Sequence, residues 1–195
     1  MTDIVHSLAI VPAAGQSERF GGMKLVADVD GEPLLDRTLR SLLDGGIDRV
    51  VVVLAPGASF PTVSRLCDHR VTIAVNPDPS RGMFSSIHVG LAAAAGDPIA
   101  VLPADMPFVR PDTIRALVEQ CVRTGAAFVP AHAGRRGHPL VLPGALRYAL
   151  LGADATTSLK EALLSLGSSP LEFPVRDDGV MRDVDTRDDL DTGRF

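Results

Sequence analysis

Residues 7–24 read SLAIVPAAGQSERFGGMK, a short apolar run followed by a loop of small residues and glycines. The run Ser7–Val11 is mostly aliphatic, which is typical of a strand buried inside a sheet. The loop after it brings two cations, Arg19 and Lys24, close to glycines that leave backbone N–H groups open to an anion. In open α/β sheets, ligands bind outside the carboxyl ends of the strands. The segment therefore predicts an α/β fold with a phosphate site at the exit of its first strand.

Two known nucleotide-binding motifs nearly fit this loop, and both fail. A Walker A loop needs a second glycine five residues after Gly15, where Phe20 stands. A dinucleotide fingerprint needs a glycine where Ser17 stands. A flexible glycine-rich turn with incidental charges remains the alternative to a phosphate site. The guanidinium of Arg19 and the ammonium of Lys24 favour the phosphate site, because they supply a hydrogen-bonding fork and a mobile point charge.

Beyond this loop, short apolar runs alternate with amphipathic segments. The expected strands are residues 7–11, 49–54, 71–75, 99–102, 127–130, 171–175 and 180–184, of which a turn at 177–179 would join the last two as a hairpin. The expected helices are residues 33–44, 85–95, 111–124 and 156–166. This alternation, without repeats or long linkers, predicts one domain over residues 1–195. Its expected architecture is a three-layer α/β/α fold with a mostly parallel (mixed) central sheet.

The composition and the residue spacings argue against several classes of protein. The chain has 195 residues, 46% of them hydrophobic, and a formal net charge of −5, so it can bury a core and shows no basic stripe for nucleic acid. Cys67 and Cys121 lie outside any CxxC pair, which predicts two reduced core thiols. The histidines show no zinc-ligand spacing. No signal sequence or membrane-length apolar run is present, so we expect a cytoplasmic protein with no membrane partner.

The string AAGQSERFGGMK, residues 13–24, resembles the LAAGxSxRFGxxK signature of the MobA-like nucleotidyltransferases, especially the molybdenum cofactor cytidylyltransferases. Pro12 stands where leucine is commoner, and isoprenoid-pathway cytidylyltransferases also carry a proline there. The resemblance implies a Rossmann-like nucleotidyltransferase fold whose loop wraps a triphosphate, with Arg19 and Lys24 stabilising the transition state. The nucleotide-binding residues that it implies here are Ala13, Ala14, Gly15, Gln16, Ser17, Arg19 and Lys24.

The metal site is expected from two aspartate motifs. Asp105-Met-Pro107, after an apolar run, matches the family's D-x-P element, whose aspartate binds the metal. A turn or capping aspartate is the alternative reading. Asp183-Val-Asp185-Thr186 resembles the family's D-x-D-T ending, and strand alternation would put Asp183 and Asp185 on one face. We expect Mg²⁺ on Asp105 and Asp185, and a catalytic set of Arg19, Lys24 and Asp105.

Two further motifs suggest how the substrates bind. Residues 76–91 resemble the family stretch that borders the nucleotide base, which implies base contacts for Asn76, Gly82 and Ser86. Residues 134–141, GRRGHPLV, resemble the G-x-x-G-H-P element that marks the cofactor cytidylyltransferases. Arg135, Arg136 and His138 could there hold an anionic acceptor such as a phosphorylated pterin. The alternative is that His138 caps a strand and that the arginines belong to the solvated surface.

These motifs together predict an Mg²⁺-dependent nucleotidyltransferase that moves a nucleoside monophosphate from an NTP to a phosphorylated acceptor and releases pyrophosphate. The resemblance points to molybdopterin as the acceptor and implies transient contact with molybdoenzyme maturation proteins. It also points to CTP, because the family's guanylyltransferases tend to carry glycine where Ala14 stands. A sugar-phosphate or other alcohol-phosphate acceptor is the enzymatic alternative. A non-catalytic nucleotide- or cofactor-binding protein is the other, but it would not need Arg19, Lys24 and Asp105 together.

Overall fold

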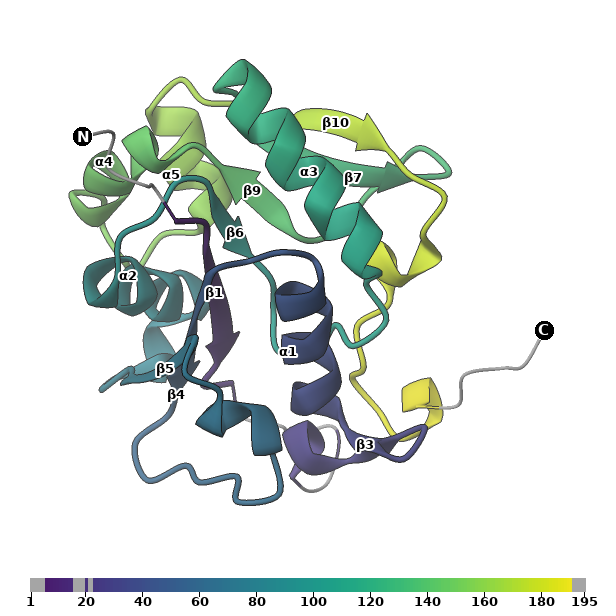
Figure 1. Cartoon of the computed structure of the whole chain (residues 1–195). Helices are drawn as coiled ribbons and strands as arrows, with labels where there is room; N and C mark the ends of the chain where they lie inside the picture. Colours follow the sequence, from purple (N-terminus) through teal and green to yellow (C-terminus); the bar gives the residue numbers. More distant parts are fainter. Residues whose placement is uncertain (1–5, 16–19, 21–22, 191–195) are drawn as a thin grey trace.

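The central element of the fold is β1 (Leu8–Ala13), which lies between two parallel neighbours, β4 (Arg49–Leu54) and β6 (Ile99–Val101). The computed structural model describes residues 6–15, 20 and 23–190. Among these residues an eight-stranded sheet runs in the order β10-β7-β9-β6-β1-β4-β5, with β8 paired to β7 (Figure 1). The antiparallel strands are β8 and β9, and the other pairings are parallel. The predicted mostly parallel, mixed sheet is confirmed.

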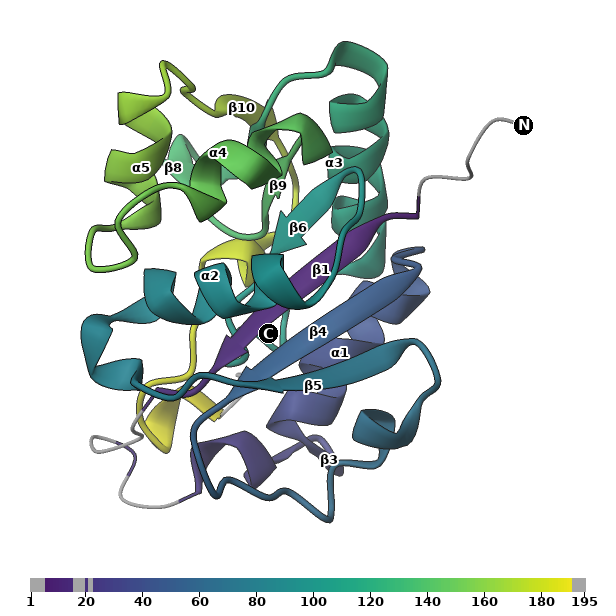
Figure 2. The same cartoon turned by 90° about the vertical axis from the view of Figure 1, so that its left-hand side faces the viewer.

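Helices cover both faces of this sheet. Figure 2 shows α2 (Met83–Ala93), α4 (Arg147–Leu151) and α5 (Leu159–Ser165) in front of the strands, whereas α1 (Leu34–Asp44) lies behind them. Helix α3 (Pro111–Thr124) packs on the same face as α1. Alternation along β1 explains the two cores, because Ala9 and Val11 enter one and Leu8 and Ile10 the other.

The remaining elements are short. The other strands are β2 (Asp28–Val29), β3 (Glu32–Pro33), β5 (Val71–Val75), β7 (Phe128–His132), β8 (Arg135–Arg136), β9 (Leu140–Leu142) and β10 (Leu171–Pro174). Short 3-10 helices span Lys24–Val26, Ser64–Cys67, Pro79–Arg81, Gly144–Leu146, Asp178–Met181 and Asp188–Leu190. Helix α3 and strands β4 and β5 have the predicted bounds. The other predicted helices differ from the observed ones by a few residues at their ends, as do the predicted strands 7–11, 99–102, 127–130 and 171–175. The sequence prediction missed β2, β3, β8 and β9, which are only two or three residues long.

Two predictions are wrong. Residues 180–184 form no strand, since a 3-10 helix spans Asp178–Met181, and β10 pairs in parallel with β7 instead of turning back as a hairpin. The turn arises because the Asp177 side chain accepts the Gly179 N–H at 3.1 Å. Cys67 is exposed on its 3-10 helix and is not a core thiol. Cys121 is buried in α3, and this burial raises the pKa of its thiol to about 11.

The topology gathers the loops that follow the strands at one edge of the sheet. The parallel strands β1 and β6 both end there. Because β4 and β6 pair with opposite sides of β1, the strand order changes direction at the exit of β1. The segment after β10 runs back past α3 to the same edge (Figure 1). Within the described part of the chain, no helix is both long enough and apolar enough to span a bilayer.

Candidate active site

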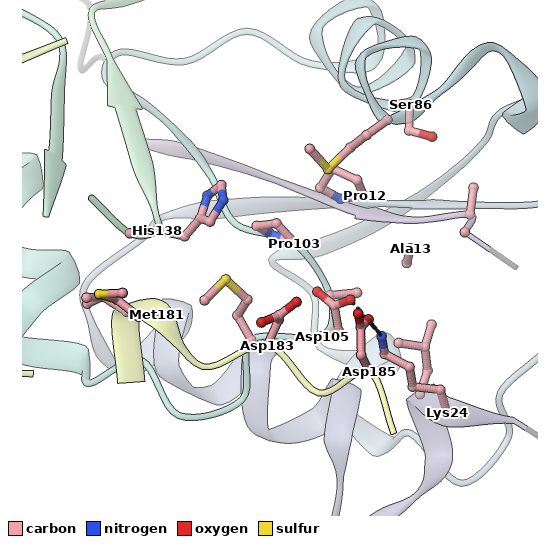
Figure 3. Close-up of a pocket in the computed structure, with 18 of the residues that line it drawn as sticks. Pro12, Ala13, Lys24, Ser86, Pro103, Asp105, His138, Met181, Asp183 and Asp185 are labelled. Carbon is pink, nitrogen blue, oxygen red and sulfur yellow. Dashed lines mark hydrogen bonds and ion pairs between the residues drawn. The ribbon is translucent and has the colours of Figure 1, made fainter. Parts of the chain in front are cut away.

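A cavity of about 660 Å³ lies at this edge of the sheet (Figure 3). Loops far apart in the sequence line it together, namely the exit of β1, the start of α2, the segment after β6, the β8–β9 connection and the chain near the C-terminus. The lining residues with predicted roles are Ala13, Ala14, Gly15, Lys24, Gly82, Ser86, Asp105, Arg135, Arg136, His138 and Asp185. Asp183 lines it as well.

The exit of β1 offers backbone to a ligand. Ala13, Ala14 and Gly15 face the cavity, and a Cβ added at Gly15 would meet no atom of the described residues within 4 Å. This open space lets a polyphosphate approach the main chain closely. The predicted residues Gln16, Ser17 and Arg19 lie outside the described residues.

Lys24 carries the positive charge of the described loop. It begins the 3-10 helix Lys24–Val26 and is 8% exposed. Its Nζ lies 2.8 Å from Asp105 Oδ2 and 3.3 Å from Asp185 Oδ1 (Figure 3). Lys24 is 81 positions from Asp105 and 161 positions from Asp185 in the sequence, yet the three residues form one ion-pair cluster. A buried ammonium is stable here because two carboxylates compensate for its lost hydration.

The chain near the C-terminus supplies two carboxylates without forming a strand. The Val184 N–H donates to the Asp105 carbonyl at 2.9 Å, which fixes this segment beside the metal motif. Val184 is fully buried in the core, whereas Asp183 and Asp185 on either side of it line the cavity. The side chains therefore alternate as the sequence predicted, although isolated backbone hydrogen bonds replace the expected strand pairing.

The residues predicted to bind the nucleotide at and before the start of α2 have two different roles. Gly82, at φ +93°, and Ser86 line the cavity. Asn76 is 2% exposed and does not line it. Its Nδ2 donates to Ser85 Oγ at 2.8 Å and to Ser86 Oγ at 3.0 Å. Asn76 therefore holds the start of α2 in place from behind, and its position argues against the direct base contact that the motif implied.

The two arginines of β8 differ in their surroundings. Arg136 Nε donates to Glu172 Oε1 on β10 at 2.8 Å. The side chain of Arg135 makes no hydrogen bond or ion pair with any residue that the structure describes. Both line the cavity, but the charge of Arg136 is already paired. An anion in this half of the cavity would therefore be attracted mainly by Arg135.

His138 faces the cavity, and its surroundings favour the neutral form of the ring. Burial lowers the pKa of its imidazole, while the charges of Asp105 and Asp183 oppose that shift. Its Nδ1 is buried and has no hydrogen-bond partner among the described residues. Its backbone N–H donates to the Val180 carbonyl at 2.8 Å. A Cβ on the preceding Gly137 would lie 2.2 Å from the same oxygen, so the loop requires glycine there.

Sequence reasoning missed the apolar wall of the cavity. Pro12, Pro103 and three methionines also line it, and Figure 3 shows Met181 facing Pro103 across the space. The methionines are Met83, Met106 and Met181. Isolated methionines at these positions carry little signal in a single sequence. Soft, adaptable side chains of this kind suit a flat aromatic ring.

Comparisons with known proteins relate the chain to a large group of enzymes. A family model described as the MobA-like NTP transferase domain matches residues 9–169. A molybdenum cofactor cytidylyltransferase from Escherichia coli (strain K12) is 24% identical, over 95% of this chain and 94% of the relative. A probable molybdenum cofactor guanylyltransferase from Natronomonas pharaonis is 32% identical over 95% of each chain. A nicotine blue oxidoreductase from Paenarthrobacter nicotinovorans is 31% identical, over 98% of this chain and 95% of the relative.

Solved structures agree on the fold. The crystal structure of Rv0371c from Mycobacterium tuberculosis H37Rv matches with a TM-score of 0.78 and 25% identity, over 94% of this chain and 95% of that chain. The predicted Rossmann-like α/β architecture is thereby confirmed.

Proposed function

The chain belongs to the MobA-like NTP transferase family, and on that premise we propose that it transfers a nucleoside monophosphate from CTP to a phosphorylated acceptor. We propose molybdopterin as this acceptor and Mg²⁺ as the metal. The observation that carries the proposal is the composition of one cavity. A loop for phosphates, a cation–carboxylate cluster and a loop with an arginine and a histidine all face the same space.

The reaction requires little covalent chemistry from the protein. An oxygen of the acceptor phosphate forms a bond to the α-phosphorus, and the bond from that phosphorus to the β-phosphate oxygen breaks. Pyrophosphate leaves with the electron pair of the broken bond. An acceptor phosphate is already ionised at neutral pH, so no general base is needed. Catalysis then depends on positioning and on neutralising negative charge, to which Lys24 would contribute from its place beside the β1 loop.

The described residues fit a magnesium site that substrate phosphates complete. Asp105 Oδ2 and Asp185 Oδ1 already converge on one cation, the Lys24 ammonium. The described residues contain no cluster of three or more His, Cys, Asp or Glu side chains that could hold a metal by themselves. Mg²⁺ commonly takes one or two carboxylates and completes its shell with phosphates and waters. Bound to Asp105 and Asp185, it would neutralise triphosphate charge and polarise the α-phosphate.

The acceptor would occupy the half of the cavity away from Lys24. Arg135 could pair with its phosphate, and the neutral ring of His138 lies beside the apolar wall that includes Met181. A planar pterin with an anionic tail matches both features. A sugar phosphate would use the arginine but leave the methionines without an aromatic partner.

The choice of CTP rests on Ala14, whose side chain is buried at the rim of the cavity. The relatives divide on this point, because one is named a cytidylyltransferase and another a probable guanylyltransferase. Purified protein incubated with Mg²⁺, each of the four NTPs and a panel of phosphorylated acceptors would test both choices. We expect pyrophosphate release with CTP and molybdopterin, and none from Asp105→Ala.

The name of the third relative calls for one control in the same experiment. Because a nicotine blue oxidoreductase shares 31% of the sequence, the protein should also be assayed for redox turnover of nicotine blue. Pyrophosphate release without redox turnover would support the transferase. Redox turnover with no release from any NTP and acceptor would overturn it.

A further inference from the structure

Lys24 occupies the position that a metal ion would share with the same carboxylates. Its Nζ bridges Asp105 Oδ2 at 2.8 Å and Asp185 Oδ1 at 3.3 Å, and only 10% of its side chain is exposed. These carboxylates belong to different segments, one after β6 and one near the C-terminus. In the structure the ammonium is therefore a cation that carboxylates of both segments share (Figure 3).

We propose that Lys24 excludes divalent metal from Asp105 and Asp185 until a nucleotide triphosphate draws its ammonium away. This inference rests on the proposed function, since it assigns the triphosphate and the metal to this cavity. It adds an order of events in which the metal binds well only together with the nucleotide.

The electrostatic argument concerns a single pair of oxygens. An ammonium and a divalent ion that share the same two oxygens repel each other, because both cations then lie within a few ångströms of one another. A metal that arrives alone must therefore displace Lys24 and leave a partly buried ammonium without its partners. A metal that arrives with a triphosphate meets no such penalty, since the phosphates offer Lys24 a new set of anions.

The structure gives Lys24 a short route to those phosphates. Lys24 lines the same cavity as Ala13, Ala14 and Gly15, and no other described residue comes within 4 Å of a Cβ placed at Gly15. A lysine side chain is a flexible four-carbon stem with a mobile charge, so it can change partners without movement of the backbone. Metal and nucleotide would thus assist each other's binding, and by linkage the assistance is equal in both directions.

Manganese binding to the full chain without nucleotide tests the proposal directly. Paramagnetic resonance of free Mn²⁺ gives its dissociation constant for the wild type, for Lys24→Met and for Lys160→Met, which removes the chain's other lysine. We expect Lys24→Met to bind Mn²⁺ at least about tenfold more tightly than the wild type, because two carboxylates lose their competing cation. Lys160→Met should match the wild type, and adding Asp105→Asn to Lys24→Met should abolish the gain. Equal or weaker binding by Lys24→Met would overturn the proposal.

A wild-type measurement covers the case in which Lys24→Met fails to fold. Because the chain has only two lysines, Lys24 and Lys160, ¹³C,¹⁵N-lysine labelling gives two resolvable sets of side-chain signals. We expect millimolar Mg²⁺ alone to leave the Lys24 signals in place, and Mg²⁺ with CTP to shift them. A full shift of the Lys24 signals with Mg²⁺ alone would overturn the proposal that the nucleotide is needed to draw the ammonium away. Neither measurement needs turnover, so an absence of pyrophosphate release would count against the proposed function and not against this inference.

Discussion

Arg135 and Arg136 are neighbours on β8, yet they differ in whether a described residue pairs with their charge. Arg136 is paired with Glu172, whereas Arg135 has no such partner among the residues that the structure describes. A charge that is already paired offers less to an incoming anion, and an exposed pair of this kind contributes little stability. The two arginines therefore form a matched pair for testing the acceptor site.

Arg135→Ala should raise the KM for the phosphorylated acceptor and leave the KM for CTP nearly unchanged. A hydrogen bond to a charged group is worth about 1.5–3 kcal/mol, which corresponds to roughly 10- to 100-fold in affinity. Arg136→Ala should change the acceptor KM by less than about threefold. Steady-state kinetics of pyrophosphate release would measure all four values. Equal effects of the two substitutions would show that pairing with Glu172 does not separate their roles.

His138 should make the fold less stable in mild acid. Burial lowers the pKa of its imidazole below the ordinary 6.5 that it regains in the unfolded chain. Between these two values the unfolded chain binds more protons, so its contribution to stability is full above about pH 6.5 and falls as the pH drops. Urea unfolding between pH 7.5 and 5 should therefore show a steeper loss for the wild type than for His138→Gln. Parallel curves of stability against pH for the two proteins would show that His138 does not cause the loss of stability in acid.

Single residues also mark where prediction from sequence stopped. Lys24, Asp105 and Asp185 could be expected to meet, because each belongs to a motif that was expected at one edge of the sheet. Asn76 could not be placed, since a motif shows that an amide is required but not whether it faces a ligand or the chain. Its bonds to Ser85 and Ser86 answer that question only in three dimensions.

At the scale of elements, the segment 177–185 decides whether the site is complete. Asp177 is 2% exposed, and its Oδ2 accepts the Arg110 N–H at 2.9 Å and the Thr113 hydroxyl at 2.7 Å. It thereby caps the start of α3 from a distant part of the chain. Further along, the Val184 N–H bonds to the Asp105 carbonyl. These anchors fix both ends of the segment that carries Asp183 and Asp185.

Asp177→Ala should destabilise the fold by about 3 kcal/mol, because it leaves buried donors of α3 without an acceptor. Urea unfolding would measure this change. Asp112→Ala is the matched control, since the Asp112 side chain is 91% exposed in the same first turn and should cost under about 0.5 kcal/mol. At a temperature where Asp177→Ala stays folded, we also expect weaker Mn²⁺ binding in the presence of CTP. A stability loss with unchanged metal affinity would limit Asp177 to capping α3.

The strand predicted at 180–184 does not form, because a local hydrogen bond gives the chain there another conformation. Val180 and Val184 bound the segment that was predicted to be a strand, and both are buried in the structure. A side-chain bond from Asp177 to the Gly179 N–H instead winds residues 178–181 into a 3-10 helix. Local capping of this kind competes with pairing, and periodicity alone cannot detect it.

Over the whole molecule, the cavity is assembled from both ends of the chain. The family model ends at residue 169, yet Asp183 and Asp185 from beyond it line the same cavity as the β1 loop. The alternation of strands and helices was predictable because it follows from local periodicity. The antiparallel β8 and β9 were not, because strands of two or three residues are too short to show a period, and β9 pairs with the distant β6.

A ligand that joins these distant segments should stabilise the molecule as a whole. At a concentration of 100 times its dissociation constant, a ligand of the native state adds about 2.7 kcal/mol, or roughly 5–10 °C in Tm for a chain of this size. We expect CTP with Mg²⁺ to raise the Tm by this amount, and CTP alone to raise it less. In Asp105→Ala the increment due to Mg²⁺ should disappear, because the first of the two carboxylates is gone. A larger rise with GTP than with CTP would assign the base to guanine and would show that Ala14 does not select cytosine.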